Sequence, residues 1–271
     1  MRYFISLSYR GSSYSGWQIQ VSQASVQAEM ERAFSIYLGS EARITGAGRT
    51  DAGVNAINYI AHFDSVNPIL VQDYSKLIYK INAILPSDIT LNDICQVAGD
   101  AHARFDAVSR TYKYFIHTKK DSFLDGYSYF FPYDIDLEKM NLAAVCLLGE
   151  RDFTSMAKLH SDVKSNICTV TEALWTPGSP MNISLTNSSF CFTISANRFL
   201  RNMVRAVVGS LLEVGRGKQE PEWIAEILEQ KNRCAAGSSV PAHPLFLTNI
   251  KYPYKIMVNN ELDFTHNSRT I

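Results

Sequence analysis

Cysteines are few in this sequence, and none stands in a paired spacing. The 271 residues include five cysteines, an odd number, and no two of them form a C-x-x-C pair. A disulfide framework needs an even set and a zinc site commonly uses such close pairs, so the sequence argues against both. The six histidines show neither H-E-x-x-H nor another ligand spacing, and we expect no metal. This pattern favours a reducing cytoplasm.

Long apolar runs are also missing. No run is long enough to span a bilayer, and the first nine residues alternate polar and apolar side chains where a signal peptide needs an unbroken apolar stretch. We therefore expect a soluble protein without a membrane partner. Hydrophobic residues make up 46% of the chain and charged residues 19%, which is enough for one large core or two smaller ones.

A net charge is absent as well, because 26 basic residues balance 26 acidic ones. Composition alone therefore does not indicate a nucleic-acid-binding protein. The distribution is more informative, since residues 102–120 and 197–218 each carry five basic side chains and one acidic side chain. These basic residues are Arg104, Arg110, Lys113, Lys119, Lys120, Arg198, Arg201, Arg205, Arg216 and Lys218. Acidic residues gather in 134–138 and 220–229, so we expect one basic face, although ordinary solvated charge also explains either cluster taken alone.

Strand and helix patterns alternate along the first hundred residues. A strand over 1–9 is followed by a Gly/Ser-rich turn, and then by a helix that begins near Ser25, a residue that can cap it. A strand over 57–63, a helix over 74–85 and a strand over 89–97 follow. This alternation is typical of an α+β sandwich.

The pattern restarts after residue 110. The expected strands are 111–117, 170–175, 181–186 and 190–196, and the expected helices are 137–148, 200–214 and 221–229. No low-complexity linker interrupts the chain. We therefore expect two similar halves, 1–105 and 106–271, in one compact unit with a cleft between them, where sites tend to form.

A glycine-rich segment in the first half has three interpretations. Residues 46–48, Gly-Ala-Gly, could open a dinucleotide-binding loop, but Asp51 replaces the third glycine of G-x-G-x-x-G, and the following residues 55–63 have a strand pattern where that loop needs a helix. A plain Asp-Ala-Gly turn is the second interpretation. The third is a catalytic loop built around Asp51.

That third interpretation rests on a resemblance. The run Gly48-Arg-Thr-Asp-Ala-Gly-Val-Asn-Ala56 resembles the signature loop of the tRNA pseudouridine synthase A family, which usually has histidine in place of Asn55. Residues 14–20, Tyr-Ser-Gly-Trp-Gln-Ile-Gln, are similar to the family's N-terminal motif, although Arg10 stands where an aspartate is usual.

Three further motifs follow in the family's order. They are Ala103-Arg-Phe-Asp-Ala107 with Arg110-Thr-Tyr-Lys-Tyr114, then Phe199-Leu-Arg-Asn-Met-Val-Arg-Ala-Val-Val-Gly209, then Ala236-Gly-Ser-Ser-Val-Pro-Ala242. Directly afterwards, His-Pro-Leu-Phe-Leu at 243–247 replaces the usual Gly-Leu-x-Leu segment.

The resemblance implies a fold, an activity and partners. The fold is α+β, with two related ferredoxin-like-derived halves forming a central, mostly antiparallel sheet flanked by helices. The activity is isomerisation of uridine to pseudouridine on the 3′ side of the anticodon stem-loop, at tRNA positions 38, 39 or 40, by a homodimer without a cofactor. Asp51 is the catalytic residue, Tyr112 stacks on the target base, and Arg205 pairs with Asp51.

The chemistry is consistent with these residue types. Isomerising uridine breaks a C–N glycosidic bond, turns the uracil and joins its carbon 5 to the ribose, with no redox change and no group lost. The Asp51 carboxylate can act as a nucleophile or as the base that starts an elimination, and both routes remain open. Burial in a cleft opposes the charged form of a carboxyl, and a nearby cation such as Arg205 restores it. Arg205 falls just beyond the edge of an apolar helical stripe, so an ordinary surface arginine is the alternative.

The RNA contacts are predicted in the same way. A uridine within a stem must be extruded before it can react, and Arg49 is the candidate side chain that intrudes into the gap, with a phosphate contact as the alternative. Tyr112 either stacks on the uracil, with its hydroxyl helping to remove the carbon 5 proton, or is a core aromatic. The remaining predicted RNA-binding residues are Arg104, Arg110, Arg198 and Arg201.

Two other functions are compatible with parts of the sequence. An RNA-binding paralogue that has lost catalysis would explain the departures at Arg10, Asn55 and 243–247, but Asp51, Tyr112 and Arg205 are present. A glycoside hydrolase would need a second carboxylate placed across the scissile bond, and the sequence shows no such pair.

Overall fold

The first half of the chain contributes four strands and two α-helices. A computed structural model describes residues 1–66, 73–158, 165–181 and 188–256 of the protein. The strands of this half are β1 (Arg2–Tyr9), β2 (Ile44–Gly46), β3 (Asn55–Asp64) and β4 (Ile89–Val97). Its helices are α1 (Val26–Leu38) and α2 (Tyr74–Ile84).

Local sequence signals explain where α1 begins and ends. The Ser25 hydroxyl accepts a hydrogen bond from the backbone N–H of Ala28 at 3.3 Å, which satisfies one of the free donors of the first turn. Gly39 ends the helix in the left-handed region at φ 67°, which glycine adopts without a Cβ clash. The buried side chains recur at helical spacing and face the sheet. They are Val26, Met30, Ala33 and Phe34.

The second half contributes the remaining elements. Its strands are β5 (Ser109–His117), β6 (Tyr129–Phe130), β7 (Gly149–Asp152), β8 (Ile167–Pro177), β9 (Ser189–Ala196) and β10 (Leu245–Lys251). Its α-helices are α3 (Leu137–Val145), α4 (Met203–Gly215) and α5 (Trp223–Gln230). No helix among the described residues has both the length and the apolar character needed to cross a bilayer.

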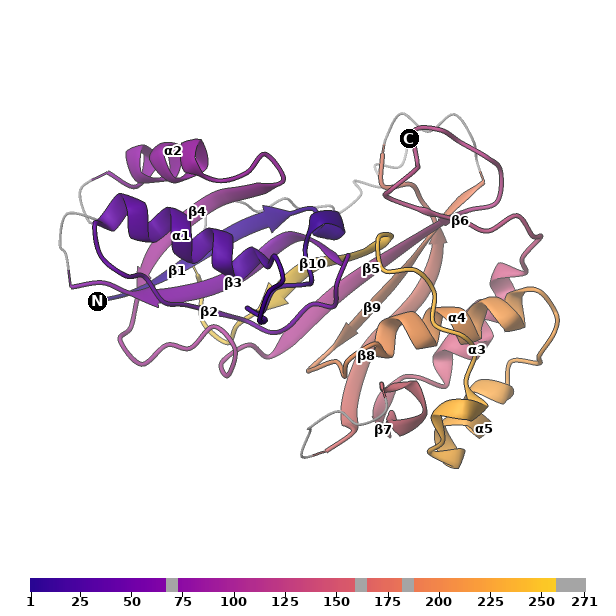
Figure 1. Cartoon of the computed structure of the whole chain (residues 1–271). Coiled ribbons are helices and arrows are strands. Elements are labelled where there is room, and N and C mark those ends of the chain that lie inside the picture. Colours follow the sequence, from indigo (N-terminus) through magenta and orange to yellow (C-terminus); the bar gives the residue numbers. More distant parts are fainter. Residues whose placement is uncertain (67–72, 159–164, 182–187, 257–271) are drawn as a thin grey trace, which may run out of the picture.

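All these strands belong to one mixed sheet (Figure 1). The strand order is β4-β1-β3-β10-β5-β9-β8-β7, with β2 paired to β3 and β6 paired to β5. The β3/β10 and β5/β6 pairs are parallel, and the other pairs are antiparallel. Helices α1 and α2 accompany the β1 to β4 end of the sheet, whereas α3, α4 and α5 accompany the β7 to β9 end. The predicted α+β fold, a mostly antiparallel sheet with outer helices, is confirmed.

Strand β10 joins the two ends of the sheet. It runs parallel to β3, with Phe246 opposite Asn55, and antiparallel to β5, with Leu247 opposite Tyr112. The sequence analysis did not predict this strand. Its residues contribute to two separate hydrophobic cores, because Leu245 packs with the second-half helices and Leu247 packs with the first-half elements.

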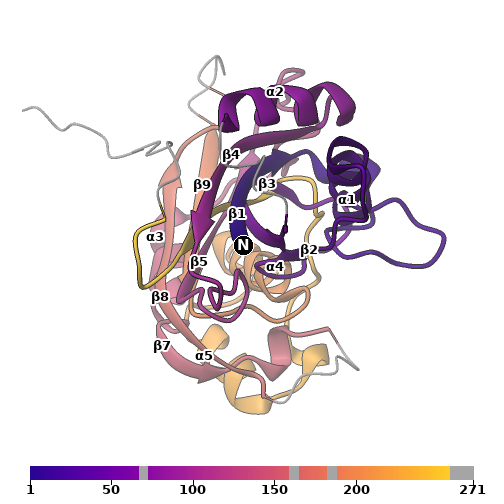
Figure 2. The same cartoon turned by 90° about the vertical axis from the view of Figure 1, so that its left-hand side faces the viewer.

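The two cores lie at opposite ends of the sheet. The first is built from β1, β3, β4, α1 and α2, and the second from β5, β8, β9, α3, α4 and α5. Figure 1 and Figure 2 both place α2 and α5 at opposite ends of the molecule. The exact boundary at residue 105 stays a prediction.

Several predicted elements differ from the structure in their bounds, and one lies mostly outside the described residues; the helix predicted over 137–148, for example, ends at Val145. The helix expected from residue 200 begins at Met203, because Asn202 adopts a left-handed backbone with φ 68° that cannot continue a right-handed helix. The strand expected over 181–186 falls almost entirely outside the described residues.

Candidate active site

The loop between β2 and β3 carries Asp51 and is tied to the N-terminal segment. Thr50, immediately before it, is buried and its hydroxyl oxygen accepts a hydrogen bond from the backbone N–H of Trp17 at 3.1 Å. The same hydroxyl lies 2.9 Å from the hydroxyl of Tyr9 on β1. The backbone N–H of Gly53 donates to the carbonyl of Tyr14 at 3.2 Å. Contacts on both sides of Asp51 therefore fix the position of the loop.

A glycine permits the close approach of these two segments. Gly16 has φ 93°, and a Cβ at this position would lie 2.1 Å from the carbonyl oxygen of Thr50. A side chain at residue 16 would therefore both strain the backbone and push the Asp51 loop away. This explains in physical terms why a Gly/Ser-rich segment precedes Trp17.

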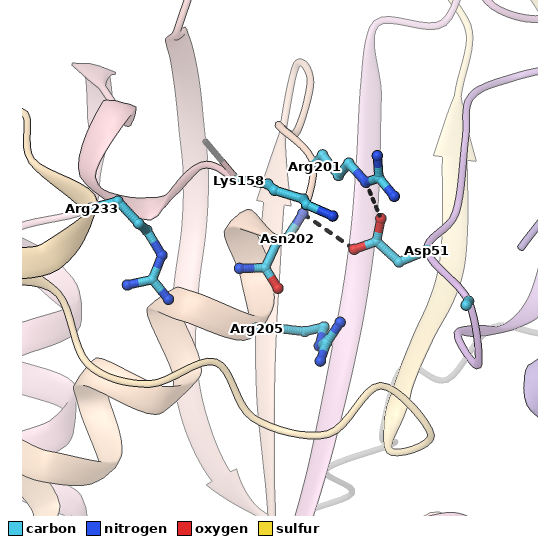
Figure 3. Close-up of a pocket in the computed structure, with 7 residues that line it drawn as sticks. Asp51, Lys158, Arg201, Asn202, Arg205 and Arg233 are labelled. Atoms are coloured by element: carbon cyan, nitrogen blue, oxygen red, sulfur yellow. Dashed lines mark hydrogen bonds and ion pairs between the residues drawn. The ribbon is translucent and has the colours of Figure 1, made fainter. Parts of the chain in front are cut away.

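The Asp51 carboxylate reaches across to the start of α4 (Figure 3). Its Oδ2 accepts a hydrogen bond from the backbone N–H of Asn202 at 3.2 Å, and its Oδ1 lies 3.7 Å from Nε of Arg201. The Asp51 side chain is 23% exposed and that of Arg201 is 61% exposed. The carboxylate is thus held by the protein on one side and open to an incoming molecule on the other.

The ion pair expected between Arg205 and Asp51 is absent from the described part of the chain. Arg201, one turn earlier, pairs with the carboxylate instead. Arg205 donates its Nε–H to the carbonyl oxygen of Val240 at 2.7 Å, because residues 236–242 run beside α4. Arg205 nevertheless lines the same cavity as Asp51.

The cavity at Asp51 has a volume of about 570 Å³ and lies between the two halves of the chain (Figure 3). Apart from Asp51, every charged residue that lines it is basic. The lining residues are Asp51, Ala52, Lys158, Arg201, Asn202, Arg205 and Arg233. An anionic ligand can therefore place a phosphate among these cations while another of its groups contacts the single carboxylate.

Tyr112 lies on β5 and contacts both hydrophobic cores. Its ring meets that of Phe199 edge to face, with the centroids 5.1 Å apart. Burial raises the pKa of the Tyr112 hydroxyl, and the negative charge of Asp51 raises it further. The phenol is therefore protonated at neutral pH. Its predicted stacking on a uracil stays a prediction.

Arg110, predicted to bind RNA, has an internal role in this structure. Its Nη1 donates to the carbonyls of Ala107 at 2.7 Å and Asn197 at 2.8 Å. Its Nη2 donates to the carbonyls of Arg104 at 2.8 Å and Ala47 at 3.2 Å. Burial lowers the pKa of this guanidinium. One side chain thus joins three segments, and one of them is the loop that carries Asp51.

The other predicted RNA-binding residues have more open positions. Arg49 is exposed on the loop two residues before Asp51. Arg104 is exposed, with its guanidinium carbon 5.7 Å from the ring centre of Phe105. Arg198 is half-buried in the segment that leads to α4. Their contacts with RNA stay predictions.

The departures from the family pattern meet at one place. Asn55 is buried, its amide oxygen accepts the N–H of Gly11 at 2.9 Å, and its amide nitrogen donates to the carbonyl of His243 at 2.6 Å. Arg10 precedes Gly11 and donates to the hydroxyl of Tyr127 at 3.4 Å. Arg10 and Asn55 are therefore both held by hydrogen bonds, and none of these bonds involves the Asp51 carboxylate.

Sequence reasoning missed three residues of the site. Lys158 and Arg233 are single basic residues outside the two basic clusters, so no local pattern marks them. Asn202 lies inside a recognised motif, but its backbone contact with Asp51 depends on a left-handed φ that the sequence does not reveal.

Known proteins resemble this chain over nearly its full length. A family profile described as tRNA pseudouridine synthase matches residues 143–253. The chain is 49% identical over 255 residues to tRNA pseudouridine synthase A of Bacteroides fragilis, covering 94% of this chain and 98% of that protein. It is 37% identical over 257 residues to tRNA pseudouridine synthase A of Bacillus subtilis, covering 93% and 99%.

A solved structure is similar at a much lower level. The archaeal box H/ACA sRNP Nop10-Cbf5 complex contains a chain that is 11% identical, with a TM-score of 0.35, covering 87% of this chain and 59% of that one. The sequence relatives are far closer. Because these relatives are 49% and 37% identical over more than nine-tenths of this chain and of their own length, the chain belongs to the tRNA pseudouridine synthase A family.

Proposed function

We propose that the protein isomerises uridine to pseudouridine in the anticodon stem-loop of tRNA, with Asp51 as its catalytic residue. Family membership supports the reaction and supports tRNA as the substrate. The motif resemblance adds the 3′ side of the stem-loop, tRNA positions 38, 39 or 40, as the targets. The observation that carries the proposal is a partly exposed carboxylate at a cavity whose other charged lining residues are all basic.

The cavity supports a nucleotide as the ligand. A volume of about 570 Å³ lies within the range of roughly 300 to 1,000 Å³ that small-molecule sites occupy. An extruded uridine brings a phosphate on each side, and Lys158, Arg201, Arg205 and Arg233 supply the opposite charge. The neutral uracil and ribose then face Asp51.

The held carboxylate supports the chemistry. The reaction breaks the bond between N1 and C1′, turns the uracil and joins C5 to C1′, while C5 gives up its proton and N1 ends protonated. Substrate and product are isomers, so neither an oxidant nor a group donor is required. Asp51 acts either as the nucleophile or as the base at the ribose, and both routes use its ionised form. Arg201 and the N–H of Asn202 stabilise that form.

Tyr112 is proposed to stack on the turning uracil. Its ring is already fixed by the edge-to-face contact with Phe199, so little conformational freedom is lost when a base packs against it. Because its hydroxyl is protonated at neutral pH, it serves as a hydrogen-bond donor in the resting site. It can take the C5 proton only after passing its own proton on.

The proposal also includes a homodimer, taken from the motif resemblance, and a cytoplasmic location, taken from the few, unpaired cysteines. Light scattering on the purified protein measures the number of subunits, and two are expected. The two cores support a division of the chain near residue 105 into halves that enclose the site.

Replacing Asp51 by asparagine tests the function. Asp51→Asn keeps the size of the side chain but removes its charge and its nucleophilic or basic oxygen, so catalysis should vanish. The assay is release of tritium from carbon 5 of labelled uridine in tRNA. A variant that still releases tritium at the parental rate contradicts the role of Asp51.

A binding titration serves as the control for that experiment. The basic residues are unchanged in Asp51→Asn, so its affinity for tRNA should stay within about tenfold of the parent, or roughly 1.4 kcal/mol. Affinity of the parent should fall steeply as salt rises, because phosphate contacts release counterions. A parent protein that binds tRNA but never releases tritium contradicts the proposed activity.

A further inference from the structure

Residues 236–242, which we call the strap, run beside α4 and are bonded to it. The N–H of Gly237 donates to the Ser210 hydroxyl at 3.0 Å. Further along, the N–H of Val240 donates to the carbonyl of Arg205 at 3.2 Å, and Arg205 returns a bond from Nε to the carbonyl of Val240 at 2.7 Å. The strap is therefore fixed to the helix whose N-terminus faces Asp51.

The strap also holds the residue that contacts the catalytic carboxylate. The side-chain amide of Asn202 donates to the Ser239 hydroxyl at 2.6 Å. Arg233 donates to the same hydroxyl at 2.9 Å and to the carbonyl of Gly237 at 3.1 Å. A continuous chain of bonds thus runs from Arg233 through Ser239 and Asn202 to Asp51, since the backbone N–H of Asn202 donates to Oδ2 of Asp51.

The backbone of Asn202 is in a conformation that needs support. Its φ of 68° lies in the left-handed region, which asparagine tolerates better than most residues but which still disfavours a Cβ. Such conformations persist where neighbouring contacts over-determine them, and they cluster at functional sites. The conformation directs the N–H of residue 202 toward the carboxylate, and it makes α4 begin at Met203. The N-terminus of this helix, which favours negative charge, therefore faces Asp51.

We propose that Asn202, Ser239 and Arg233 are positioning residues that aim the backbone N–H of residue 202 at the Asp51 carboxylate. The inference rests on the proposed function, because it assumes that Asp51 is the catalytic residue. It assigns a purpose to the strap motif, which otherwise touches neither Asp51 nor the open side of the carboxylate. It also makes the left-handed backbone, more than the asparagine side chain itself, the feature that the reaction requires.

Two substitutions of Asn202 distinguish the effect of its backbone conformation from the effect of its side-chain amide. Asn202→Ala removes the amide that bonds to Ser239 but keeps a Cβ, which disfavours the left-handed region, so residue 202 should relax and its N–H should leave Asp51. Asn202→Gly also removes the amide, but glycine adopts positive φ freely. At saturating tRNA we expect the single-turnover rate of Asn202→Ala to fall about 10- to 100-fold, and that of Asn202→Gly to be about tenfold higher than the alanine variant.

A third substitution tests the strap itself. Ser239→Ala removes the hydroxyl that joins Asn202 to Arg233 without touching Asp51, and it should lower the rate about three- to tenfold. In all three variants the loss should appear in kcat and should not be confined to KM for tRNA, because the bonds that are removed join protein groups to one another. Lys231→Ala is the matched control, since Lys231 is also left-handed, with φ 48°, but lies at the end of α5. It should turn over at the parental rate.

Four outcomes overturn the inference while the parent remains active. These are full activity in Asn202→Ala, equal losses in the alanine and glycine variants, full activity in Ser239→Ala, or losses confined to KM. Thermal unfolding of each variant shows whether it is folded, and Ser239→Ala carries the test if Asn202→Ala does not fold. A parent protein that releases no tritium contradicts the proposed function itself, so the two failures are distinguishable.

Discussion

Replacing Arg110 by methionine should destabilise the protein and leave its electrostatic attraction for RNA unchanged. Arg110 stands in a basic cluster, and its sequence context predicts a phosphate contact. In the structure its guanidinium instead donates four hydrogen bonds to backbone carbonyls in three segments. Methionine keeps much of the apolar packing but removes all four donors.

The expected loss in the free energy of unfolding depends on how exposed these four hydrogen bonds are. The bonds to Asn197 and Arg104 are exposed, and water can replace them at little cost. The bonds to Ala107 and Ala47 are partly buried. A hydrogen bond from a charged group contributes about 1.5–3 kcal/mol, so losing these two should cost at least about 3 kcal/mol. At about 2–4 °C per kcal/mol for a chain of this size, Tm should fall by about 6–12 °C.

Calorimetry and tRNA binding at several salt concentrations distinguish the two roles. A phosphate contact would leave Tm unchanged and reduce the slope of log affinity against log salt by about one. Arg104→Met is the matched control, because the Arg104 side chain is exposed and its carbonyl remains available to Arg110. An Arg110→Met protein with the parental Tm and a reduced salt slope would refute the internal role.

Three other perturbations have defined outcomes. His62 is buried, and burial lowers its pKa to about 4. As the pH falls, the unfolded state therefore binds a proton before the folded state does, and the free energy of unfolding should fall by roughly 3 kcal/mol from pH 6.5 to pH 4. His62→Asn, whose oxygen can accept the N–H of Ala103 that Nδ1 accepts now, should remove that dependence in urea titrations. Gly209→Ala places a Cβ 1.8 Å from the Ser238 carbonyl oxygen, so calorimetry should show a loss of about 1–3 kcal/mol, with slower tritium release. Because the pKa of Tyr112 is raised above its ordinary value, the single-turnover rate should not rise between pH 7 and 9 through phenol ionisation, and a tenfold rise per pH unit would show a phenolate base.

Local signals predicted most of the elements. The strand expected over 89–97 matches β4 at both ends, and α1 was predicted from a cap and a periodic apolar face. Strand β10 escaped prediction because it is short and follows a His-Pro pair. What defines it is pairing with β3 and β5, which come from distant parts of the sequence. Such pairing leaves no local pattern.

The site was predictable to a similar extent. The motif resemblance located Asp51 but named Arg205 as its partner. Arg201 stands four residues earlier, on the same side of the helical pattern, so the sequence offered no reason to choose it instead. In the structure Arg201 pairs with Asp51, whereas Arg205 donates a hydrogen bond to the Val240 carbonyl of the strap. The contact from Asn202 depends on a backbone angle set by tertiary bonds, and helix periodicity contains no information on it.

The central position of β10 has a consequence for the order in which the protein folds. Until residues 245–251 have left the ribosome, one edge of β3 is covered only by the short β2, and one edge of β5 is covered only by the short β6. Each half can bury much of its own core early, but both nascent sheets present open edges that invite pairing with other chains. The strand that closes both edges follows the other described elements in the sequence, and its arrival brings the Asp51 loop and α4 together. The Asp51 site therefore assembles late, because it depends on pairing between strands that are distant in the sequence. Until that pairing forms, the incomplete chain is the form most prone to aggregate.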